Sequence, residues 1–181
     1  GGPAAEAAML EPAAVRHLIL VDAAIGLSTA ATPACEEGGW LQSAIGWRQL
    51  RTALLANTAT QPLFSAMLLK QFVARKAAVT DARTALYLPP LKVQGSSAAL
   101  GDWAYQFATS CEPNRSRTVQ GFNNLKPPLT LLWGELDDIT PLQQARDLAA
   151  AAGNATLVPL PGVGHIPQIE DPDDFNAKLV A

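Results

Sequence analysis

The sequence has 181 residues, of which 49% are hydrophobic and 16% are charged, and its formal net charge is −3. This length suffices for the core of one ordinary domain, and the composition excludes intrinsic disorder, which needs low hydrophobicity and high charge. The scattered charges argue against nucleic acid as the main partner, because phosphate binding needs a basic face. No apolar run reaches the roughly 18–20 residues of a membrane span.

Cysteine and histidine are scarce in this chain. Cys35 and Cys111 either form one disulfide or both stay reduced, and the sequence leaves the two possibilities open. A structural zinc site needs four nitrogen or sulfur ligands at close spacing, which these cysteines with His17 and His165 do not supply. The chain also has no Gly-x-Gly-x-x-Gly motif and no phosphate-binding loop. We therefore expect neither a metal nor a cofactor.

The first 24 residues predict a helix followed by a strand. Residues 3–10 are rich in alanine, which favours a helix that packs closely on a sheet. Residues 18–21 are continuously apolar, which is typical of a strand covered on both faces in a parallel sheet. His17 stands just before this strand and is expected to be structural. Asp22 stands just after it and is expected to cap or to face a cleft, without a catalytic role.

Residues 25–124 predict a helical cap with no convincing strand. The expected helices cover residues 40–56, a stretch from Pro62 onward, and residues 96–107. Residues 87–91 include Pro89 and Pro90 and are expected to be extended, and residues 111–117 are expected to be a loop. Large apolar side chains are expected to form the core of this cap and in part to line a substrate pocket: Trp40, Trp47, Met67, Phe72, Trp103 and Phe107.

Residues 125–181 return to alternating strands and helices. The expected elements are a strand at 129–133, a helix from Thr140-Pro141 to Gly153, a strand at 156–160 and a helix from Asp171-Pro172. The Thr140 hydroxyl is expected to cap the start of the first of these helices, and Gly153 is expected to cap its end. Strands and helices thus alternate at both ends of the chain. The sequence predicts an α/β fold with three parallel strands and flanking helices, built from residues 1–24 and 125–181, with the helical cap inserted between them.

Two loops follow strands of this expected sheet, at the edge where ligands of open parallel sheets bind. The loop after residue 133 carries Asp137, and the loop after residue 160 carries His165. A histidine that acts as a general base needs a partner that fixes its tautomer and stabilises the imidazolium. Glycines beside His165 allow the backbone to turn it inward. The pattern therefore predicts that the Asp137 carboxylate and the His165 imidazole meet within hydrogen-bonding distance.

The motifs in these loops are specific. One loop reads Trp133-Gly134-Glu135-Leu136-Asp137 and continues with Ile139-Thr140-Pro141; the other reads Gly162-Val163-Gly164-His165-Ile166-Pro167. They resemble the acid loop and the histidine loop of the α/β-hydrolase superfamily, above all its cap-bearing members: C–C bond hydrolases, esterases, epoxide hydrolases and dehalogenases. The resemblance implies a nucleophile–histidine–acid triad in which Asp137 is the acid, with Asp138 as the fallback, and His165 is the base.

The superfamily's nucleophile sits in a Gly-x-Ser-x-Gly elbow, which this sequence lacks. Gly1-Gly2 and the alanine-rich helix resemble the family's segment immediately after the elbow, so Gly1 is expected to be the elbow's last glycine. The nucleophile, the oxyanion donors and the preceding strands would then lie upstream, and the chain would be an inactive C-terminal part. No serine or cysteine present has the strand–turn–helix setting of a nucleophile: Ser28, Ser43, Ser65, Ser96, Ser97, Ser110, Ser116, Cys35 and Cys111.

The resemblance implies hydrolysis of a small ester or a similar carbonyl substrate under an apolar lid, with no nucleic acid as partner. The strand at 18–21 would have an open edge, so a missing N-terminal half or a second copy of the chain is the expected protein partner. Two alternatives stay open: an Asp nucleophile, as in epoxide hydrolases and dehalogenases, and a non-catalytic binding protein of the same fold. The sequence shows no signal peptide, which favours the cytoplasm or an organelle over secretion.

Overall fold

The computed structural model of the chain describes residues 1–27, 46–58, 61–109 and 114–180. The described residues fall into two compact units. The first comprises those of Gly1–Pro33, Phe72–Ala78 and Pro113–Ala181, and the second those of Ala34–Gln71 and Val79–Glu112. The cap expected over residues 25–124 therefore differs from the second unit, because Phe72–Ala78 and residues 114–124 belong to the same unit as the sheet.

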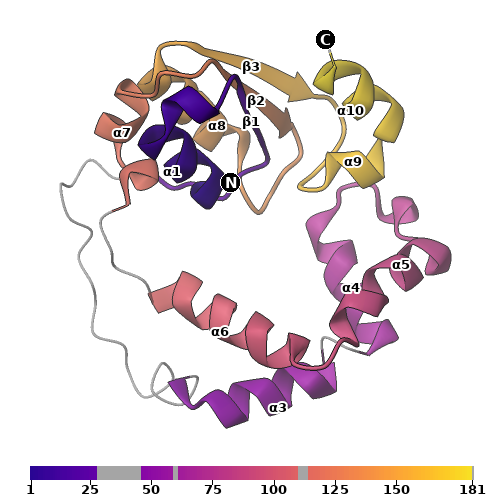
Figure 1. Cartoon of the computed structure of the whole chain (residues 1–181). Helices are drawn as coiled ribbons and strands as arrows, with labels where there is room; N and C mark the ends of the chain where they lie inside the picture. Colours follow the sequence, from indigo (N-terminus) through magenta and orange to yellow (C-terminus); the bar gives the residue numbers. More distant parts are fainter. Residues whose placement is uncertain (28–45, 59–60, 110–113, 181) are drawn as a thin grey trace. The chain divides into compact units, whose positions relative to one another are not determined.

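A three-stranded parallel sheet forms the centre of the first unit (Figure 1). Strand β1 (Leu18–Val21) pairs with β2 (Leu129–Gly134), and β2 pairs with β3 (Ala155–Leu160). Each strand was expected from its apolar run, and the observed bounds agree to within one residue. The α/β fold class, with three parallel strands and flanking helices, is confirmed.

Five α-helices and three short 3₁₀ turns accompany this sheet among the described residues of the first unit. The helices are α1 (Gly2–Leu10), α7 (Val119–Asn123), α8 (Leu142–Ala152), α9 (Pro167–Glu170) and α10 (Pro172–Leu179), and the turns are Pro12–Ala14, Lys76–Ala78 and Arg115–Arg117. The last helix begins at Pro172 and α8 ends at Gly153, both as expected. Asp171 caps α10 by accepting the N–H of Asp174, and Gly153 is in the left-handed conformation. The short helix α9 was not expected.

The sheet is covered on both faces. Side chains such as Leu20 and Leu131 are buried in one cluster with Ala5 and Ala8 of α1 and with helix α8. On the opposite face, Leu132 packs in a second cluster, against which Phe175 of α10 lies. Each buried leucine contributes about 1.5–3 kcal/mol through the removal of its apolar surface from water. The small side chains of the α1 alanines let that helix approach the sheet closely.

The second unit consists of helices. They are α3 (Arg48–Thr58), α4 (Pro62–Phe72, whose last residue belongs to the first unit), α5 (Asp81–Leu91) and α6 (Ser96–Thr109). The start of the helix expected at 40–56 lies outside the described residues. Helices α3 and α6 are joined by Asp102, which accepts hydrogen bonds from Arg48 and Arg51. The Arg51 guanidinium also stacks 4.8 Å from the centre of the Tyr105 ring.

The expected extended segment at 87–91 is wrong, because Pro89 and Pro90 lie inside the last turn of α5. The Thr80 hydroxyl accepts the N–H of Arg83 and starts the helix. Pro89 and Pro90 have no N–H, so each removes one intrahelical bond, but only Leu91 follows them in the helix and the loss is confined to its last turn.

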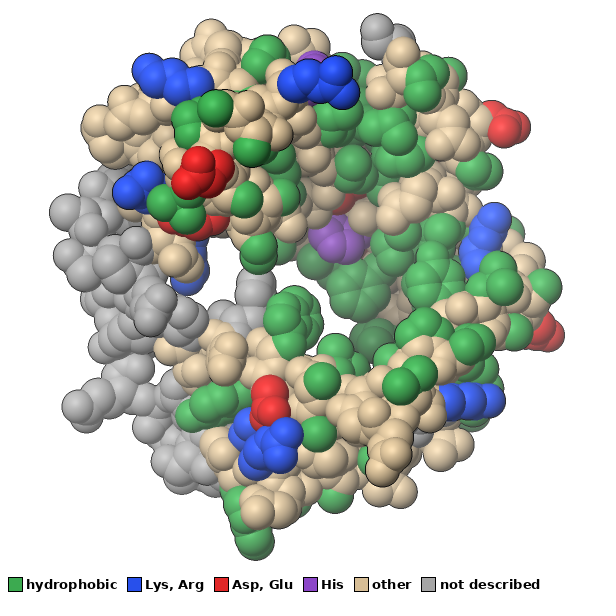
Figure 2. All heavy atoms as spheres, in the orientation of Figure 1, with side chains coloured by type: hydrophobic (Ala, Val, Ile, Leu, Met, Phe, Trp, Pro, Cys, Tyr) green, Lys and Arg blue, Asp and Glu red, His purple; other side chains and the backbone are tan. Residues whose placement is uncertain are grey.

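The expected cap core is also wrong for three of its side chains. Trp47, Met67 and Trp103 are 63%, 59% and 61% exposed. Figure 2 shows hydrophobic side chains on the surface of these helices, between isolated charged groups. Trp40 and the side chain of Phe107 lie outside the described part of the structure. Among the described helices, none is long and apolar enough to cross a membrane.

Candidate active site

The loops that follow β2 and β3 lie against each other. The N–H of Glu135 donates to the Leu160 carbonyl at 3.0 Å, and the N–H of Leu136 donates to the Val163 carbonyl at 3.0 Å. A Cβ atom at Gly134 would lie 2.2 Å from the Gly164 carbonyl oxygen, so this approach requires glycine. The two loops that the sequence singled out are therefore fixed side by side at the carboxyl ends of their strands.

Asp137 and His165 meet in this place. The Nδ1 atom of His165 lies 2.8 Å from Oδ2 of Asp137, which is the contact expected from the sequence. The carboxylate is buried, whereas the imidazole is 19% exposed. The other carboxylate oxygen, Oδ1, accepts the backbone N–H groups of Ile139 and Thr140, each at 2.9 Å. The carboxylate thus has a fixed orientation, and the imidazole has one edge toward it and part of its surface accessible.

The Thr140 hydroxyl completes the surroundings of the carboxylate. Its Oγ1 lies 2.5 Å from Oδ2 of Asp137 and 3.1 Å from Nδ1 of His165. The expectation that this hydroxyl caps α8 is wrong: the cap residue is Pro141, and no side chain caps that helix. The helix begins at Leu142, so Thr140 lies one residue before the cap position, and its hydroxyl donates to the Asp137 carboxylate. The spacing of Asp137 and Thr140, three residues apart in a loop, is a signal that could have indicated this contact.

The pKa of the Asp137 carboxyl lies below its usual value. Burial alone would raise this pKa, but hydrogen bonds from the Thr140 hydroxyl and N–H, from His165 and from the Ile139 N–H outweigh it. Asp137 is therefore charged at neutral pH and accepts a proton-bearing Nδ1. A neutral imidazole with its proton on Nδ1 has a lone pair on Nε2, where it can act as a base. Within the described residues, Nε2 of His165 makes no hydrogen bond.

Phe72, in a segment that is far from the two loops in sequence, contacts both the backbone and the ring of His165. The N–H of His165 donates to the Phe72 carbonyl at 3.0 Å, and the centres of the two rings lie 5.7 Å apart. Phe72 was expected in the core of the cap, but it belongs to the same unit as His165. Its packing against the imidazole restricts the rotation of that ring.

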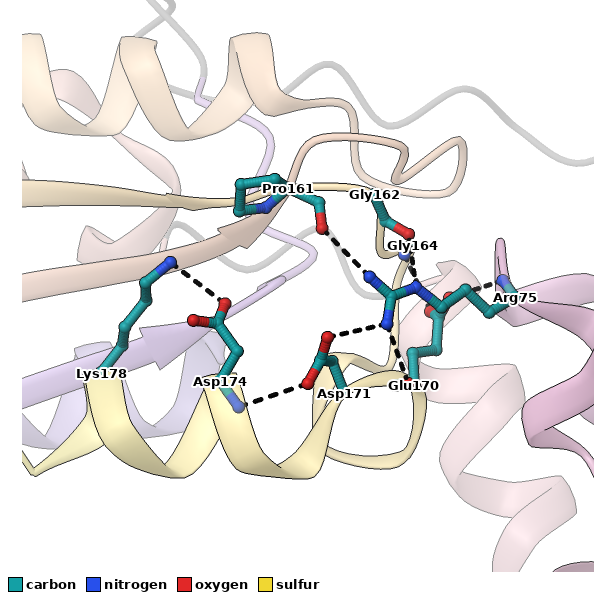
Figure 3. Close-up of polar contacts among 8 residues, drawn as sticks. All are labelled: Arg75, Pro161, Gly162, Gly164, Glu170, Asp171, Asp174 and Lys178. Atoms are coloured by element: carbon teal, nitrogen blue, oxygen red, sulfur yellow. Dashed lines mark hydrogen bonds and ion pairs between the residues drawn. The ribbon is translucent and has the colours of Figure 1, made fainter.

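The same segment is tied to the histidine loop by Arg75 and Glu170, which we call the Arg75–Glu170 clamp (Figure 3). Glu170 is buried and accepts the N–H of Gly164 at 2.8 Å and the N–H of Arg75 at 2.7 Å. The Arg75 guanidinium donates to the Gly162 carbonyl at 2.9 Å and to Asp171 at 2.7 Å. These contacts therefore fix the loop both before and after His165. A role at the site was not expected from the sequence for either Arg75 or Glu170.

The remaining candidates lie apart from the imidazole. Asp138, the fallback acid, is exposed and makes no hydrogen bond within the described residues. His17 lies 2.8 Å from the Thr130 hydroxyl in an exposed position. Asp22 is buried, and its Oδ1 accepts the Gly134 N–H at 2.8 Å. Several candidates lie outside the described residues: Cys35, Cys111, Ser28, Ser43 and Ser110. Over the described ranges, no group of acidic, histidine or cysteine side chains could hold a metal ion.

The chain belongs to the α/β-hydrolase fold family, whose model matches residues 1–172. No curated protein sequence matches the chain.

Solved structures of the same fold agree with this assignment. A meta-cleavage product hydrolase from Pseudomonas fluorescens IP01 is 20% identical, with a TM-score of 0.69, over 99% of this chain and 59% of that one. The 2-hydroxy-6-oxo-6-phenylhexa-2,4-dienoate hydrolase from Rhodococcus sp. strain RHA1 is 16% identical, with a TM-score of 0.56, over 96% of this chain and 57% of that one. The chain thus spans less than two thirds of the length of these proteins.

Proposed function

We propose that this chain supplies the acid and the base of a hydrolase triad, with Asp137 as the acid and His165 as the base. The observation that carries the proposal is the 2.8 Å contact between a buried carboxylate and the Nδ1 atom of a partly exposed imidazole. Membership of the α/β-hydrolase family supports hydrolysis as the reaction class.

In the proposed reaction, Nε2 of His165 takes the proton from a nucleophile as that group attacks a carbonyl carbon of the substrate. The imidazolium that forms donates a hydrogen bond from Nδ1 to Asp137, whose negative charge stabilises it. The same Nε2–H then protonates the leaving group. His165 then takes a proton from water as this water attacks the covalent intermediate, and the imidazolium returns the proton to the nucleophile when the bond between nucleophile and product breaks, which restores the neutral imidazole. Asp137 keeps its charge throughout this cycle.

We propose that the nucleophile lies outside these 181 residues, two positions before Gly1. Gly1 packs so closely on Ala23 that a Cβ atom on it would lie 2.3 Å from the Ala23 Cβ, which suits the last glycine of a nucleophile elbow. The free Nε2 of His165 within the described part of the structure is also consistent with an external nucleophile. On this proposal the 181 residues alone do not turn over substrate.

The proposed substrate is a small ester or a cleavable ketone. The support is the fold shared with a meta-cleavage product hydrolase and a 2-hydroxy-6-oxo-6-phenylhexa-2,4-dienoate hydrolase. An Asp nucleophile would instead give epoxide hydrolase or dehalogenase chemistry, and the residue two positions before Gly1 distinguishes these cases. A binding protein without catalysis is the remaining alternative, and turnover excludes it.

The experiment uses the complete reading frame that contains this chain, assayed with 4-nitrophenyl acetate and with 2-hydroxy-6-oxo-6-phenylhexa-2,4-dienoate. We expect His165→Ala to lower kcat/KM by about a hundredfold or more, because the general base is lost. His17→Ala is the matched control, since this histidine contacts Thr130 away from the site. Equal activity of the two histidine variants would refute the assignment. Turnover by the 181 residues alone that His165→Ala abolishes would refute the external nucleophile.

A further inference from the structure

Asp22 is a buried acid whose two side-chain oxygens have different surroundings. It follows β1 and is 4% exposed. Its Oδ1 accepts the Gly134 N–H at 2.8 Å, whereas its Oδ2 is buried and has no hydrogen-bond partner among the described residues. A buried oxygen with a full negative charge and no donor is costly, because it has lost its water without compensation. The charge state of Asp22 is therefore not the usual one for an aspartate.

The acid whose charge acts most strongly on Asp22 is Asp137. The Thr140 hydroxyl lies between the two residues, 3.3 Å from the Asp22 carbonyl oxygen and 2.5 Å from Oδ2 of Asp137. Asp137 already accepts hydrogen bonds from the Ile139 N–H, the Thr140 N–H, the Thr140 hydroxyl and the His165 imidazole. It is thus the carboxylate that carries the charge. Two neighbouring buried carboxylates do not both ionise, so the proton of the pair resides on Asp22.

We propose that Asp22 is a neutral carboxylic acid that donates its Oδ2 proton to the Asp137 carboxylate, and that it is a positioning residue for the Asp137–His165 pair. The catalytic meaning of this contact rests on the proposed function. The contact leaves one negative charge instead of two next to the imidazole, and it gives the unpartnered Oδ2 a partner. It also adds a further hydrogen bond to the carboxylate that orients His165.

The backbone of Asp22 is fixed in the position that this contact needs. Its φ is +40°, which is unusual for a residue other than glycine. The N–H of Asp22 donates to the Leu132 carbonyl at 3.1 Å, and its own carbonyl accepts the Thr140 hydroxyl at 3.3 Å. The surrounding contacts thus hold a strained conformation, as is typical of functional sites. Strand β2 contacts both the main chain and the side chain of Asp22, through Leu132 and Gly134, and the loop after β2 contacts its main chain through Thr140.

The charged groups around Asp22 favour the neutral form. Burial raises the pKa of Asp22 to about 8; the Gly134 N–H lowers it, and the negative charges of Asp137 and Glu170 raise it. The imidazole of His165 contacts the Asp137 carboxylate, and Asp22 makes no ion pair within the described residues. The Asp22 proton is therefore present at pH 7 and is lost as the pH rises through about 8.

Asp22→Asn mimics the protonated acid. The amide oxygen can accept the Gly134 N–H, the NH2 group can donate to Asp137, and asparagine tolerates a positive φ better than most residues. Asp22→Ala removes both contacts and serves as the comparison. If Asp22 is neutral in the folded protein, asparagine preserves the site. If it is charged, asparagine removes a charge on which the fold depends.

The first measurement is the unfolding equilibrium of the protein and of Asp22→Asn from pH 4 to pH 9. Because the folded pKa of Asp22 lies above the usual value of 3.8, the wild type binds this proton more tightly when folded, and its stability falls as the pH rises from about 4 to about 8. Asp22→Asn lacks this effect. We expect the ratio of the two unfolding constants to change by up to about tenfold per pH unit in this window and to level off above it. A constant ratio would overturn the proposal.

The second measurement is the carboxyl ¹³C NMR titration of Asp22 in the wild type, assigned through its own Cβ, so that it does not depend on any variant folding. We expect the signal of a protonated acid at pH 7 and a titration near pH 8. A titration near pH 4 would overturn the proposal. Neither measurement needs turnover, so an inactive enzyme would count against the proposed function and not against the neutral Asp22.

The third measurement separates a positioning role from a purely structural one. In the complete enzyme, the pH profile of kcat/KM is expected to show an inflection near pH 8 in the wild type, caused by the second charge beside Asp137. This inflection should be missing in Asp22→Asn, while Asp22→Ala should be impaired at every pH. The same inflection in wild type and Asp22→Asn would show that Asp22 does not act on the pair.

Discussion

The surroundings of the Asp137 carboxylate determine what His165 can do. Backbone N–H groups of its own loop and the Thr140 hydroxyl donate to it, so the position of the acid does not depend on His165. The donors keep the pKa of Asp137 below its usual value despite burial. An acid that stays charged and fixed gives the imidazole one favoured tautomer, in which Nε2 is the free basic atom.

Thr140→Val tests the contribution of the hydroxyl. The variant keeps the backbone N–H but loses the side-chain donor to Asp137, so we expect the free energy of unfolding at neutral pH to fall by about 1–2 kcal/mol. Because the folded pKa of Asp137 is depressed, its contribution is present at neutral pH and is lost as the pH falls through that pKa. The loss should begin at a higher pH in Thr140→Val.

Urea unfolding between pH 2 and pH 7 measures both effects, and Thr140→Ser is the matched control because it retains the hydroxyl. We expect Thr140→Ser to resemble the wild type on the acid side. If Thr140→Ser and Thr140→Val behaved alike, packing of the methyl group would explain the loss, and the proposed role of the hydroxyl would be wrong.

At the scale of the elements, the strands were predictable and the contacts that join distant segments were not. Continuous apolar runs such as residues 18–21 are a local signal of a buried parallel strand, and the strand bounds could be predicted from them. The strand-exit positions of Asp137 and His165 then implied their contact. The prediction for Pro89 and Pro90 was wrong, because the preference of proline for extended backbone is weak enough for the helix that begins at Asp81 to include both in its last turn.

The Arg75–Glu170 clamp had no local signal. Arg75 precedes Glu170 by 95 residues, and the contact is made through a backbone N–H that every residue other than proline possesses. Nothing in the sequence of Phe72–Ala78 indicates that this stretch leaves the helical unit and joins the sheet unit. The second role of Thr140 was missed for a related reason: a hydroxyl before Pro141 fits a helix cap equally well.

Glu170→Gln tests the clamp. The N–H groups of Gly164 and Arg75 donate to different oxygens of Glu170, and glutamine replaces one of these oxygens by an NH2 donor, so one N–H loses its acceptor. We expect a loss of about 1–3 kcal/mol in the free energy of unfolding, because one buried donor is left unpaired. Asp174→Asn is the matched control: it breaks the partly exposed ion pair with Lys178 and should cost about 0.5 kcal/mol or less. Equal losses in urea unfolding would contradict the clamp.

At the scale of the whole molecule, the sheet of the described residues ends at β1. The strand order is β1-β2-β3, so one side of β1 has no neighbouring strand among these residues, and Ile19 on this strand is 38% exposed. Open strand edges pair with other strands, which leads to association. This supports the proposal that a further segment or a second copy of the chain is the partner at β1.

We expect the 181-residue chain to associate in a concentration-dependent way and Ile19→Lys to shift it toward monomers, since a charged side chain on an edge strand opposes pairing. Leu10→Lys is the matched control, because Leu10 is 52% exposed but lies on α1. Sedimentation of the three proteins at several concentrations makes the comparison. A wild-type chain that stays monomeric at all concentrations would contradict the role of the edge.

The joint action of Asp137 and His165 is tested most directly by a double-mutant cycle in the complete enzyme. kcat/KM is measured for the wild type, Asp137→Asn, His165→Ala and the double variant. Because the carboxylate acts through the imidazole 2.8 Å away, the double variant should be no slower than His165→Ala alone. Losses that multiply, so that the double variant is slower than His165→Ala by the full factor of Asp137→Asn, would show that the two residues act independently.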